Sequence, residues 1–506
     1  MNMAIQKLSW SPQQQAFLNA CEHGKNSIIV IAVAGSGKTT VCIEGAKRLK
    51  GATAMVAFNT KIAAEIKDRL AAAGLDWKKA RGGTAHSFGY GVYVKSYKLA
   101  EKPSSKKVPN LLAAYCAEHP GERFIVEYAK PIATLISFAK QAAIGVLGRM
   151  EDKRLWRDLI DHHDIWDRDD DEAGVETLIA TAIKFLKLSN EQTDIIDFDD
   201  MIYLPLLFRL RFWTYDNVIV DEAQDTNAAR RALVRAMLRK GGRVIAVGDP
   251  SQAINGFAGA DNDALDRIKE DFNCVQMPLT VSYRCPKAVV RYAQQWAAHI
   301  LPAETAIEGS VTDMTLDELL NTSLSGNDAI LCRNNKPLVG LAMKLIRRRI
   351  GCKIEGKEIG AQLSNLAHRW SSIKTLEALR NKLGQYFEAQ RTNLTAKKEE
   401  QKLGVIEDQV DCLQTIIGQC IREGETSIKA VDAYLEKLFG DEVKGVVTLS
   451  SIHKSKGREW NRVFWLDKEK TCPSKWARQA WQEEQEHNLM YVAATRSQNA
   501  LVLVTS

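Results

Sequence analysis

The sequence predicts an α/β protein with two parallel-sheet domains, each interrupted by an insertion of helices. Short apolar strands alternate with helical periodicity from residue 28 onward, which is typical of a parallel sheet. The strand signals fade over 89–191 and again over 364–442, where helical periodicity dominates. Because 506 residues exceed what one compact core holds, we expect a first domain at 1–88 and 192–278, its insertion at 89–191, a second domain at 279–363 and 443–506, and its insertion at 364–442.

The first sheet is predicted from apolar runs that are followed by turns or helices. Residues 28–33 form the first run, 54–58 form the second, and a helix is expected over 61–70. Within the insertion, helical spacing is clearest over 129–145 and 173–188. Apolar runs that begin at Val218 and Arg243 return the chain to the sheet. The first domain is therefore expected to be discontinuous.

The second sheet is expected to begin near Val281 and to include strands at 328–332, 446–449, 463–465 and 500–504. Between its parts, apolar residues recur at heptad spacing in two runs separated by the charged segment 397–402: Leu376, Leu379, Leu383 and Tyr386, then Leu403, Ile406, Val410, Leu413 and Ile417. We interpret these runs as a helical hairpin. We expect the hairpin to pack mainly on itself.

Composition excludes several classes of protein. No apolar stretch approaches the ~20 residues of a membrane span, and the first residues do not resemble a signal peptide, so we expect a cytoplasmic protein. Ten cysteines without a CxxC pair argue against a zinc site and a disulfide framework. The net charge of +7 permits a polyanionic partner without requiring one. The chain stops at Ser506, soon after its last motif, so we expect no nuclease domain.

The first motif is a small-residue loop between the apolar run 28–33 and a helix. Its backbone N–H groups are expected to surround phosphate oxygens at the positive end of that helix. Lys38 would reach the β and γ phosphates of a nucleoside triphosphate, and the Thr39 hydroxyl would bind Mg²⁺. The predicted phosphate-binding residues are Ala34, Gly35, Ser36, Gly37, Lys38, Thr39 and Thr40. Ala32 stands where such loops usually begin with glycine.

A second motif follows the apolar run at Val218. Asp221 and Glu222 come directly after this run, at the expected carboxyl edge of the sheet. Asp221 is predicted to lie near the metal of the phosphate loop, and Glu222 is predicted to orient the attacking water. Together the two motifs predict ATP and Mg²⁺ as ligands.

These motifs and several others, in their order along the chain, resemble the UvrD/Rep family of superfamily 1 helicases. The resemblance covers nearly the whole chain and implies two RecA-like P-loop NTPase domains. It implies that Gln14, in Ser11-Pro12-Gln13-Gln14-Gln15, reads adenine. It also implies that the segments around Phe58-Asn59 and Thr84-Ala85-His86 contact single-stranded DNA, through Phe58, Asn59, Thr84 and His86. The segment Ile196 to Asp200 also recurs in the family.

The segment Val247 to Ala260 is similar to the family's third motif. The resemblance implies that Gln252 senses the γ-phosphate and that Phe257 stacks on a base. Asn255 replaces a tyrosine that is usual in the family, and Ala258 replaces an arginine. These two differences concern contacts to the DNA strand and leave the predicted ATP site unchanged.

In the second domain the resemblance assigns residues of three further motifs. It implies that Tyr283 packs on adenine and that Arg284 and Arg496 are arginine fingers for the γ-phosphate. The segment Thr448 to Trp460 supplies a DNA-contacting histidine and a nucleotide-binding glycine and glutamate, which are His453, Gly457 and Glu459. In the last motif His487 and Asn488 stand where the family commonly has an arginine pair.

The function implied by the resemblance is an ATP-dependent 3′–5′ single-stranded DNA translocase and DNA helicase, with hydrolysis coupled to strand movement. Single-stranded DNA, single-strand/duplex junctions and protein partners in repair, replication or defence are the expected partners. Two alternatives stay open at this point. One is an ATP-gated binding module that uses hydrolysis only for release, and the other is RNA as the substrate.

Overall fold

The computed structural model describes residues 9–166, 171–261, 263–348, 350–396, 400–439, 446–475 and 477–506. The chain forms two compact units: unit 1 comprises Met1–Val33 and Gly37–Leu279, and unit 2 comprises Ala34–Ser36 and Thr280–Ser506. Each unit contains a six-stranded sheet in which all paired strands are parallel. Among the helices of these residues, none has the length and apolarity needed to cross a membrane. The predicted α/β class with two parallel sheets is confirmed.

The sheet of unit 1 has the strand order β3-β2-β4-β5-β1-β6. Its strands are β1 (Ile28–Ala32), β2 (Thr53–Ala57), β3 (Ala80–Thr84), β4 (Tyr215–Asp221), β5 (Leu238–Gly248) and β6 (Val275–Leu279). Strand β1 reads Ile-Ile-Val-Ile-Ala because both of its faces are covered by helices, as parallel strands require. Strand β6 was not predicted from the sequence, because it is short, contains Pro278 and lies at the edge of the sheet.

Two helical layers cover this sheet. One core contains Met55 and Ile219 together with apolar side chains of α1 (Pro12–His23), α2 (Lys38–Arg48) and α3 (Thr60–Ala72). The opposite core contains Val218 and Val220 together with side chains of α4 (Ala85–Ser96), α9 (Asp200–Leu207), α10 (Ala228–Met237) and α11 (Ala264–Asp271). Neighbouring residues of β4 thus enter opposite cores, as the alternation of side chains along a strand dictates.

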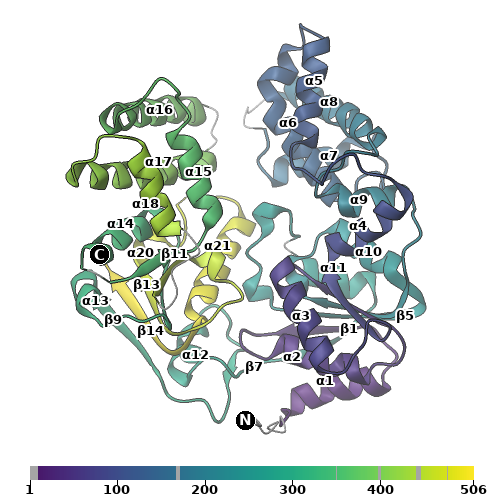
Figure 1. Cartoon of the computed structure of the whole chain (residues 1–506). Coiled ribbons are helices and arrows are strands. Elements are labelled where there is room, and N and C mark those ends of the chain that lie inside the picture. Colours follow the sequence, from purple (N-terminus) through teal and green to yellow (C-terminus); the bar gives the residue numbers. More distant parts are fainter. Residues whose placement is uncertain are drawn as a thin grey trace. The chain divides into compact units, whose positions relative to one another are not determined.

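The described part of the first insertion consists of helices joined by loops, with one isolated β-bridge between Ile144 and Gly148. Helices α5 (Lys107–Glu118), α6 (Arg123–Gln141), α7 (Lys153–His162) and α8 (Glu172–Glu191) share one buried core and gather at one end of unit 1 (Figure 1). The helix expected over 129–145 begins earlier and ends at Gln141, because Ala143 has a left-handed backbone with φ of 55°.

The sheet of unit 2 has the strand order β11-β12-β10-β13-β14-β9. Its strands are β9 (Ser310–Thr315), β10 (Asp328–Cys332), β11 (Cys352–Ile354), β12 (Val447–Ser451), β13 (Trp460–Leu466) and β14 (Ser497–Thr505), and a separate pair is formed by β7 (Val281–Ser282) and β8 (Leu301–Pro302). The helices outside the hairpin are α12 (Lys287–Ala293), α13 (Leu316–Asn321), α14 (Asn335–Arg347), α15 (Lys357–Ala367), α18 (Lys429–Phe439), α19 (Ile452–Ser455), α20 (Lys468–Thr471) and α21 (Ala480–Ala494). Both edge strands, β9 and β11, were missed by the sequence prediction because one is largely polar and the other has three residues.

The predicted hairpin consists of α16 (Leu376–Ala396) and α17 (Glu400–Arg422), which lie side by side (Figure 1). The expectation that it packs mainly on itself is wrong. Leu379 and Leu413 belong to the same buried cluster as Ile330 of β10. In addition, the Asp408 carboxylate of α17 accepts hydrogen bonds from the backbone N–H groups of Asn335 (3.2 Å) and Lys336 (2.7 Å) at the start of α14. The heptad residues therefore join the hairpin to the core of unit 2. The residues 397–399 and the expected boundary at 442/443 lie outside the described residues.

Candidate nucleotide and nucleic-acid site

The phosphate loop connects β1 to α2 at the carboxyl edge of the sheet. Gly35 and Gly37 have φ values of 73° and 78°, a left-handed conformation that glycine adopts without steric penalty. Gly37 directly precedes α2, and a Cβ placed on it would lie 3.4 Å from Nε2 of Gln14. Gln14 is itself fixed by Ser11, since the two residues form a capping box at the start of α1. The predicted adenine-reading glutamine thus lies beside the predicted phosphate loop.

The acidic motif meets this loop across the end of β4. The Thr39 hydroxyl donates a hydrogen bond to Oδ2 of Asp221 over 2.9 Å. Burial raises the pKa of Asp221 to about 6, and the neighbouring Glu222 carboxylate adds to this rise. Glu222 has a φ of 54°, which is uncommon for a residue with a side chain, and its N–H bonds to Oδ1 of Asp221 over 3.0 Å. The turn therefore holds the two carboxylates in different directions.

Hydrogen bonds link Glu222 to the third motif. Nε2 of Gln224 donates to Oε2 of Glu222 over 2.5 Å, while Oε1 of Gln224 accepts the N–H of Asp249 over 3.0 Å. The Asp249 carboxylate in turn accepts from Nε2 of Gln252 over 2.5 Å and lies 4.0 Å from Nζ of Lys38. Asp249 is completely buried, and burial raises its pKa despite the nearby Lys38. Lys38, Glu222 and Gln252 therefore belong to one connected network.

This donor set fits Mg²⁺. The Thr39 hydroxyl and the Asp221 carboxylate are oxygen ligands of the kind that Mg²⁺ prefers. The buried Asp221 carboxylate accepts hydrogen bonds from the Thr39 hydroxyl and from the N–H of Glu222. Among the described residues there is no group of three or more His, Cys, Asp or Glu side chains that could hold a metal ion.

Four of the predicted DNA-contacting residues lie at or just after the ends of two neighbouring strands, since Ala57 of β2 pairs with Thr84 of β3. The Asn59 side chain caps α3, and the Thr84 hydroxyl caps α4, so both have a structural role as well. The Phe58 ring lies 4.8 Å from the Arg230 guanidinium. His86 and Arg230 both line a cavity of about 140 Å³, where burial lowers the pKa of His86 to about 4. Arg230 was not predicted, because nothing in the helical pattern of α10 distinguishes it.

The remaining predicted aromatic, Phe257, is 61% exposed in the short 3₁₀ turn Gly256–Ala258. Just before it, Asn255 donates a hydrogen bond to the Asp225 carboxylate over 2.9 Å. The residue that replaces the family's tyrosine thus ties this turn to the acidic motif at the end of β4. Phe257 is therefore largely exposed on a turn that the Asn255–Asp225 hydrogen bond helps to fix.

Unit 2 brings most of its predicted nucleotide residues together. Nε of Arg284 donates to Oε2 of Glu459 over 2.5 Å, and Gln498 donates to the other oxygen over 2.8 Å. Tyr283 is 50% exposed, and Gly457 has a φ of 79°. Arg496 is buried and donates to the carbonyl oxygens of Val492 (2.9 Å) and Arg458 (3.3 Å).

His453 has a different environment from that of the Arg284–Glu459 pair. Burial lowers the pKa of His453 to about 3, and the positive charge of Arg333 lowers it further. Arg333 itself forms a two-pronged ion pair with the buried Glu486. His453 is therefore neutral at physiological pH and can take part in hydrogen bonds but not in ionic contacts.

Comparison with known proteins identifies the family to which the chain belongs. The profile of the UvrD/REP helicase N-terminal domain matches residues 10–273, and that of the UvrD-like helicase C-terminal domain matches residues 357–506. The chain belongs to the UvrD/REP helicase family. The first match alone covers more than half of the chain and includes the phosphate loop, the acidic motif and the helical insertion.

Several curated helicases of the UvrD/REP family are similar to parts of the chain. The ATP-dependent DNA helicase Rep of Salmonella typhimurium is 27% identical over 311 residues, which are 56% of this chain and 42% of Rep. DNA helicase IV of Escherichia coli is 27% identical over 307 residues, or 52% of this chain and 43% of the helicase. PcrA of Staphylococcus epidermidis is 30% identical over 131 residues, which are 24% of this chain and 18% of PcrA. The chain thus aligns with less than half the length of these relatives.

The segment Ile196 to Asp200 closes a buried ion cluster. Lys140 bonds to Asp197 over 2.5 Å and to Asp200 over 2.7 Å, and Lys107 bonds to Asp200 over 2.8 Å. Burial favours uncharged lysine, but the Asp200 and Asp197 carboxylates raise the pKa of Lys140 above its ordinary value. The cluster connects α5 and α6 to the segment that leads back to the sheet. Its lysines were missed because a buried lysine has no signal in a helical pattern.

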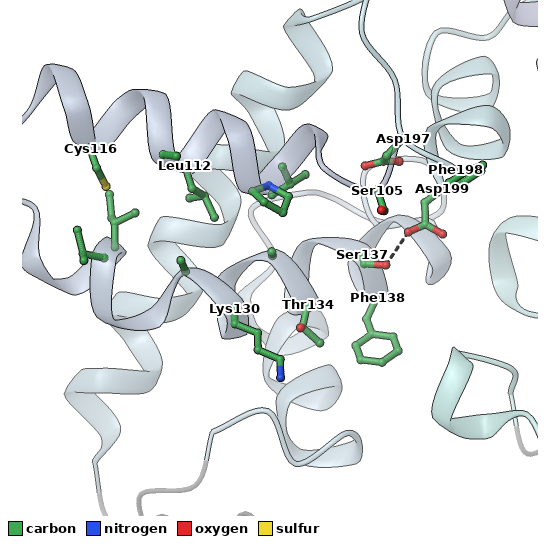
Figure 2. A pocket seen from close by; sticks show the side chains of 17 residues that line it. Ser105, Leu112, Cys116, Lys130, Thr134, Ser137, Phe138, Asp197, Phe198 and Asp199 are labelled. Carbon is green, nitrogen blue, oxygen red and sulfur yellow. Dashed lines mark hydrogen bonds between the residues drawn. The ribbon is translucent and has the colours of Figure 1, made fainter. Parts of the chain in front are cut away.

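Beside this cluster lies an apolar groove of about 700 Å³ between α5 and α6 (Figure 2). Figure 2 shows Ser137 bonded to Asp199 at one end of the groove, close to Phe198, which is 55% exposed. Burial raises the pKa of Asp199 to about 6. The segment Ile196 to Asp200 therefore has one buried ionic side and one side that opens on the groove.

Proposed function

We propose that this chain is an ATP-dependent DNA helicase that translocates 3′ to 5′ along single-stranded DNA. The observation that carries the proposal is the connected network of Lys38, Thr39, Asp221, Glu222 and Gln252 at the carboxyl edge of the unit 1 sheet. Two relatives named ATP-dependent DNA helicase Rep, 26–27% identical over 311 residues, support the same activity. Polarity follows from the family resemblance and is part of the proposal.

Each residue of the network has a proposed task in phosphoryl transfer. The N–H groups of the phosphate loop and the charge of Lys38 bind the β and γ phosphates. Thr39 and Asp221 would hold Mg²⁺, which offsets phosphate charge when it is bound. Glu222, held by Gln224, accepts the proton of the attacking water. Gln224 also bonds to Asp249, and Asp249 bonds to Gln252. A contact of Gln252 with the γ-phosphate is therefore transmitted through these hydrogen bonds to Glu222, the general base.

The residues of unit 2 complete the proposed nucleotide chemistry. We assign contact with adenosine to Tyr283, Gly457 and Glu459, and stabilisation of the developing γ-phosphate charge to Arg284 and Arg496. Arg284 is held at a fixed orientation by its bond to Glu459. We also propose the domain boundaries stated above for two RecA-like domains, with each helical insertion placed between the two parts of a sheet.

The proposed path of DNA uses Phe58, Asn59, Thr84, His86 and Phe257 of unit 1, with His453 of unit 2. Exposed aromatic rings can hold successive bases by stacking, at roughly 1–3 kcal/mol per base. Single-stranded DNA and single-strand/duplex junctions are the proposed substrates.

The proposal is tested by measuring ATP hydrolysis with and without single-stranded DNA, and by displacing streptavidin from a biotinylated strand. We expect DNA-stimulated hydrolysis that is lost in Lys38→Ala, and displacement from the 5′ end but not from the 3′ end. Hydrolysis without displacement at either end would instead indicate an ATP-gated binding module. Stronger stimulation by an RNA strand of the same sequence would contradict the assignment of DNA.

A further inference from the structure

A basic pocket lies at the amino edge of the unit 1 sheet, away from the network that binds nucleotide. Its volume is about 820 Å³, and it is lined by the C-terminal ends of α4 and α9, the loop 209–214 and the start of β5. We call it the amino-edge pocket and define it by Lys95, Arg209, Arg211, Trp213 and Arg239. Strand β4 begins beside it at Tyr215 and ends at Asp221 in the nucleotide site. Seven residues of strand, or about 23 Å, separate the two places.

The charge of the amino-edge pocket is positive and largely uncompensated. None of its lining residues is acidic. Arg239 is paired with Asp216, but Lys95, Arg209 and Arg211 form no ion pair within the described ranges. In contrast, the nearby Arg231 pairs with Asp261 and Asp271. A surface that only needed solubility would not gather unpaired cations around a hollow, because like charges at short range repel.

The Trp213 ring contacts two cations, Lys95 of the pocket lining and Arg81, which does not line the pocket. Nζ of Lys95 lies 3.4 Å from the centroid of the ring, and the guanidinium carbon of Arg81 lies 5.3 Å away. Such cation–π contacts are worth about 0.5–1 kcal/mol each at exposed sites and limit the motion of the cations. Because the ring is engaged by cations, the pocket is suited to recognise phosphates rather than to stack a base.

Arg209 occupies a position where glycine is usual. At the end of helix α9 the N–H of Arg209 donates to the carbonyl oxygen of Leu206 (3.1 Å). The N–H of Leu210 donates to the carbonyl oxygen of Pro205 (2.9 Å). In this kind of helix end the Arg209 position is left-handed, and here its φ is 50°. A cation typically favours a helix C-terminus by about 0.3–1 kcal/mol, which does not exceed the steric penalty of the left-handed backbone, about 1–2 kcal/mol. The end of α9 concerns Arg209 alone. It therefore does not explain the positions of Lys95, Arg81 and Arg211.

We propose that the amino-edge pocket binds the phosphodiester backbone of single-stranded DNA, as a second contact separate from the path at the carboxyl edge. The proposal rests on DNA being the substrate, as stated under Proposed function. A flexible single strand can bend its phosphates into a concave pocket, whereas a rigid duplex meets such a pocket only at its rim. Arg209, Arg211 and Lys95 supply the cations, so binding is independent of base sequence and sensitive to salt.

The test compares the double variant Arg209→Gly/Arg211→Ala with a control that removes the same charge outside the pocket, Arg149→Ala/Lys269→Ala. Affinity is measured by fluorescence anisotropy over a range of salt concentrations, using oligonucleotides of about 10 and about 40 nucleotides. The short strand fills only the carboxyl-edge path. Glycine suits the backbone at position 209, so this substitution should not lower the melting temperature, and Arg211→Ala alone serves as a second variant.

For the long strand we expect affinity to fall roughly 10-fold in the pocket variant, with the slope of log K against log salt reduced by about 1.4. The short strand should bind equally to wild type, variant and control, and should stimulate ATP hydrolysis equally. A slope for the long strand equal to that of the control would overturn the proposal, as would an equal loss of affinity for the short strand. Absence of any DNA-stimulated hydrolysis in the wild type would instead count against the proposed function itself.

Discussion

Replacement of Lys140 by methionine tests the buried ion cluster at the base of the first insertion. In the wild type two lysines balance two aspartates, because Lys107 and Lys140 face Asp197 and Asp200 in a largely buried cluster. Methionine fills a similar volume but leaves both carboxylates with Lys107 alone. Breaking a buried ion pair in this way costs about 3–5 kcal/mol of unfolding free energy.

The unpaired carboxylate limits this penalty by taking up a proton. Neutralising an aspartate with an ordinary pKa near 4 costs about 4 kcal/mol at pH 7 and about 1.5 kcal/mol at pH 5, from 1.36 kcal/mol per pH unit. The variant holds a carboxyl group whose pKa is raised in the folded state, so the variant loses stability relative to wild type as pH rises. The defect is therefore expected to be large at pH 7 and small at pH 5.

The assay is thermal unfolding followed by circular dichroism at both pH values. For a folding unit of this size, 4 kcal/mol lowers the melting temperature by about 8–16 °C. The double variant Lys140→Met/Asp197→Asn restores charge balance and should recover most of the loss. A Lys140→Met protein that melts within 2 °C of wild type at pH 7, or a double variant no more stable than the single one, would refute this account of the cluster.

Three further predictions concern single side chains. Glu222→Gln should bind ATP and keep its fold, since an amide can still accept the Gln224 hydrogen bond, but should hydrolyse ATP about 10²–10⁴-fold more slowly; unchanged turnover would remove Glu222 as the base. Phe257→Ala should weaken single-strand binding by about 1–3 kcal/mol in anisotropy titrations without changing unstimulated hydrolysis, and equal affinity would argue against stacking. Asp199→Asn should gain melting temperature relative to wild type as pH rises from 5 to 8, because a carboxyl with a pKa of about 6 is destabilised once it ionises; a difference independent of pH would contradict this.

The sequence was most informative where a local pattern has one structural meaning. Apolar β-branched runs predicted β1, β4 and β10, and the residues that follow β1 and β4 meet through the Thr39–Asp221 bond. Parallel strands place their carboxyl ends at one edge, so residues almost two hundred positions apart could be joined from the pattern alone.

Prediction failed where the meaning of a residue depends on distant partners. Heptad leucines indicated a hairpin, but the same spacing also fits a helix that packs on a sheet domain, which is what α17 does. Lys140 and Arg230 resemble solvent-facing residues of amphipathic helices, yet their partners come from segments far along the chain. Gln224 and Asp249 were visible within recognised motifs, but only their hydrogen bonds revealed that they connect Glu222 with Gln252.

The strand order of unit 1 has a consequence for how the protein is made. Strand β1 pairs only with β5 and β6 among the described strands, so Ile28 meets its partner Ile245 about 220 residues later. At a synthesis rate of about 5–20 residues per second, the run Ile-Ile-Val-Ile-Ala leaves the ribosome some 10–40 s before it can enter a sheet. During that interval the helical insertion, whose core is local in sequence, can fold first. The nascent chain thus carries an exposed, aggregation-prone strand next to a folded helical module, which makes β1 the expected point of engagement for a chaperone.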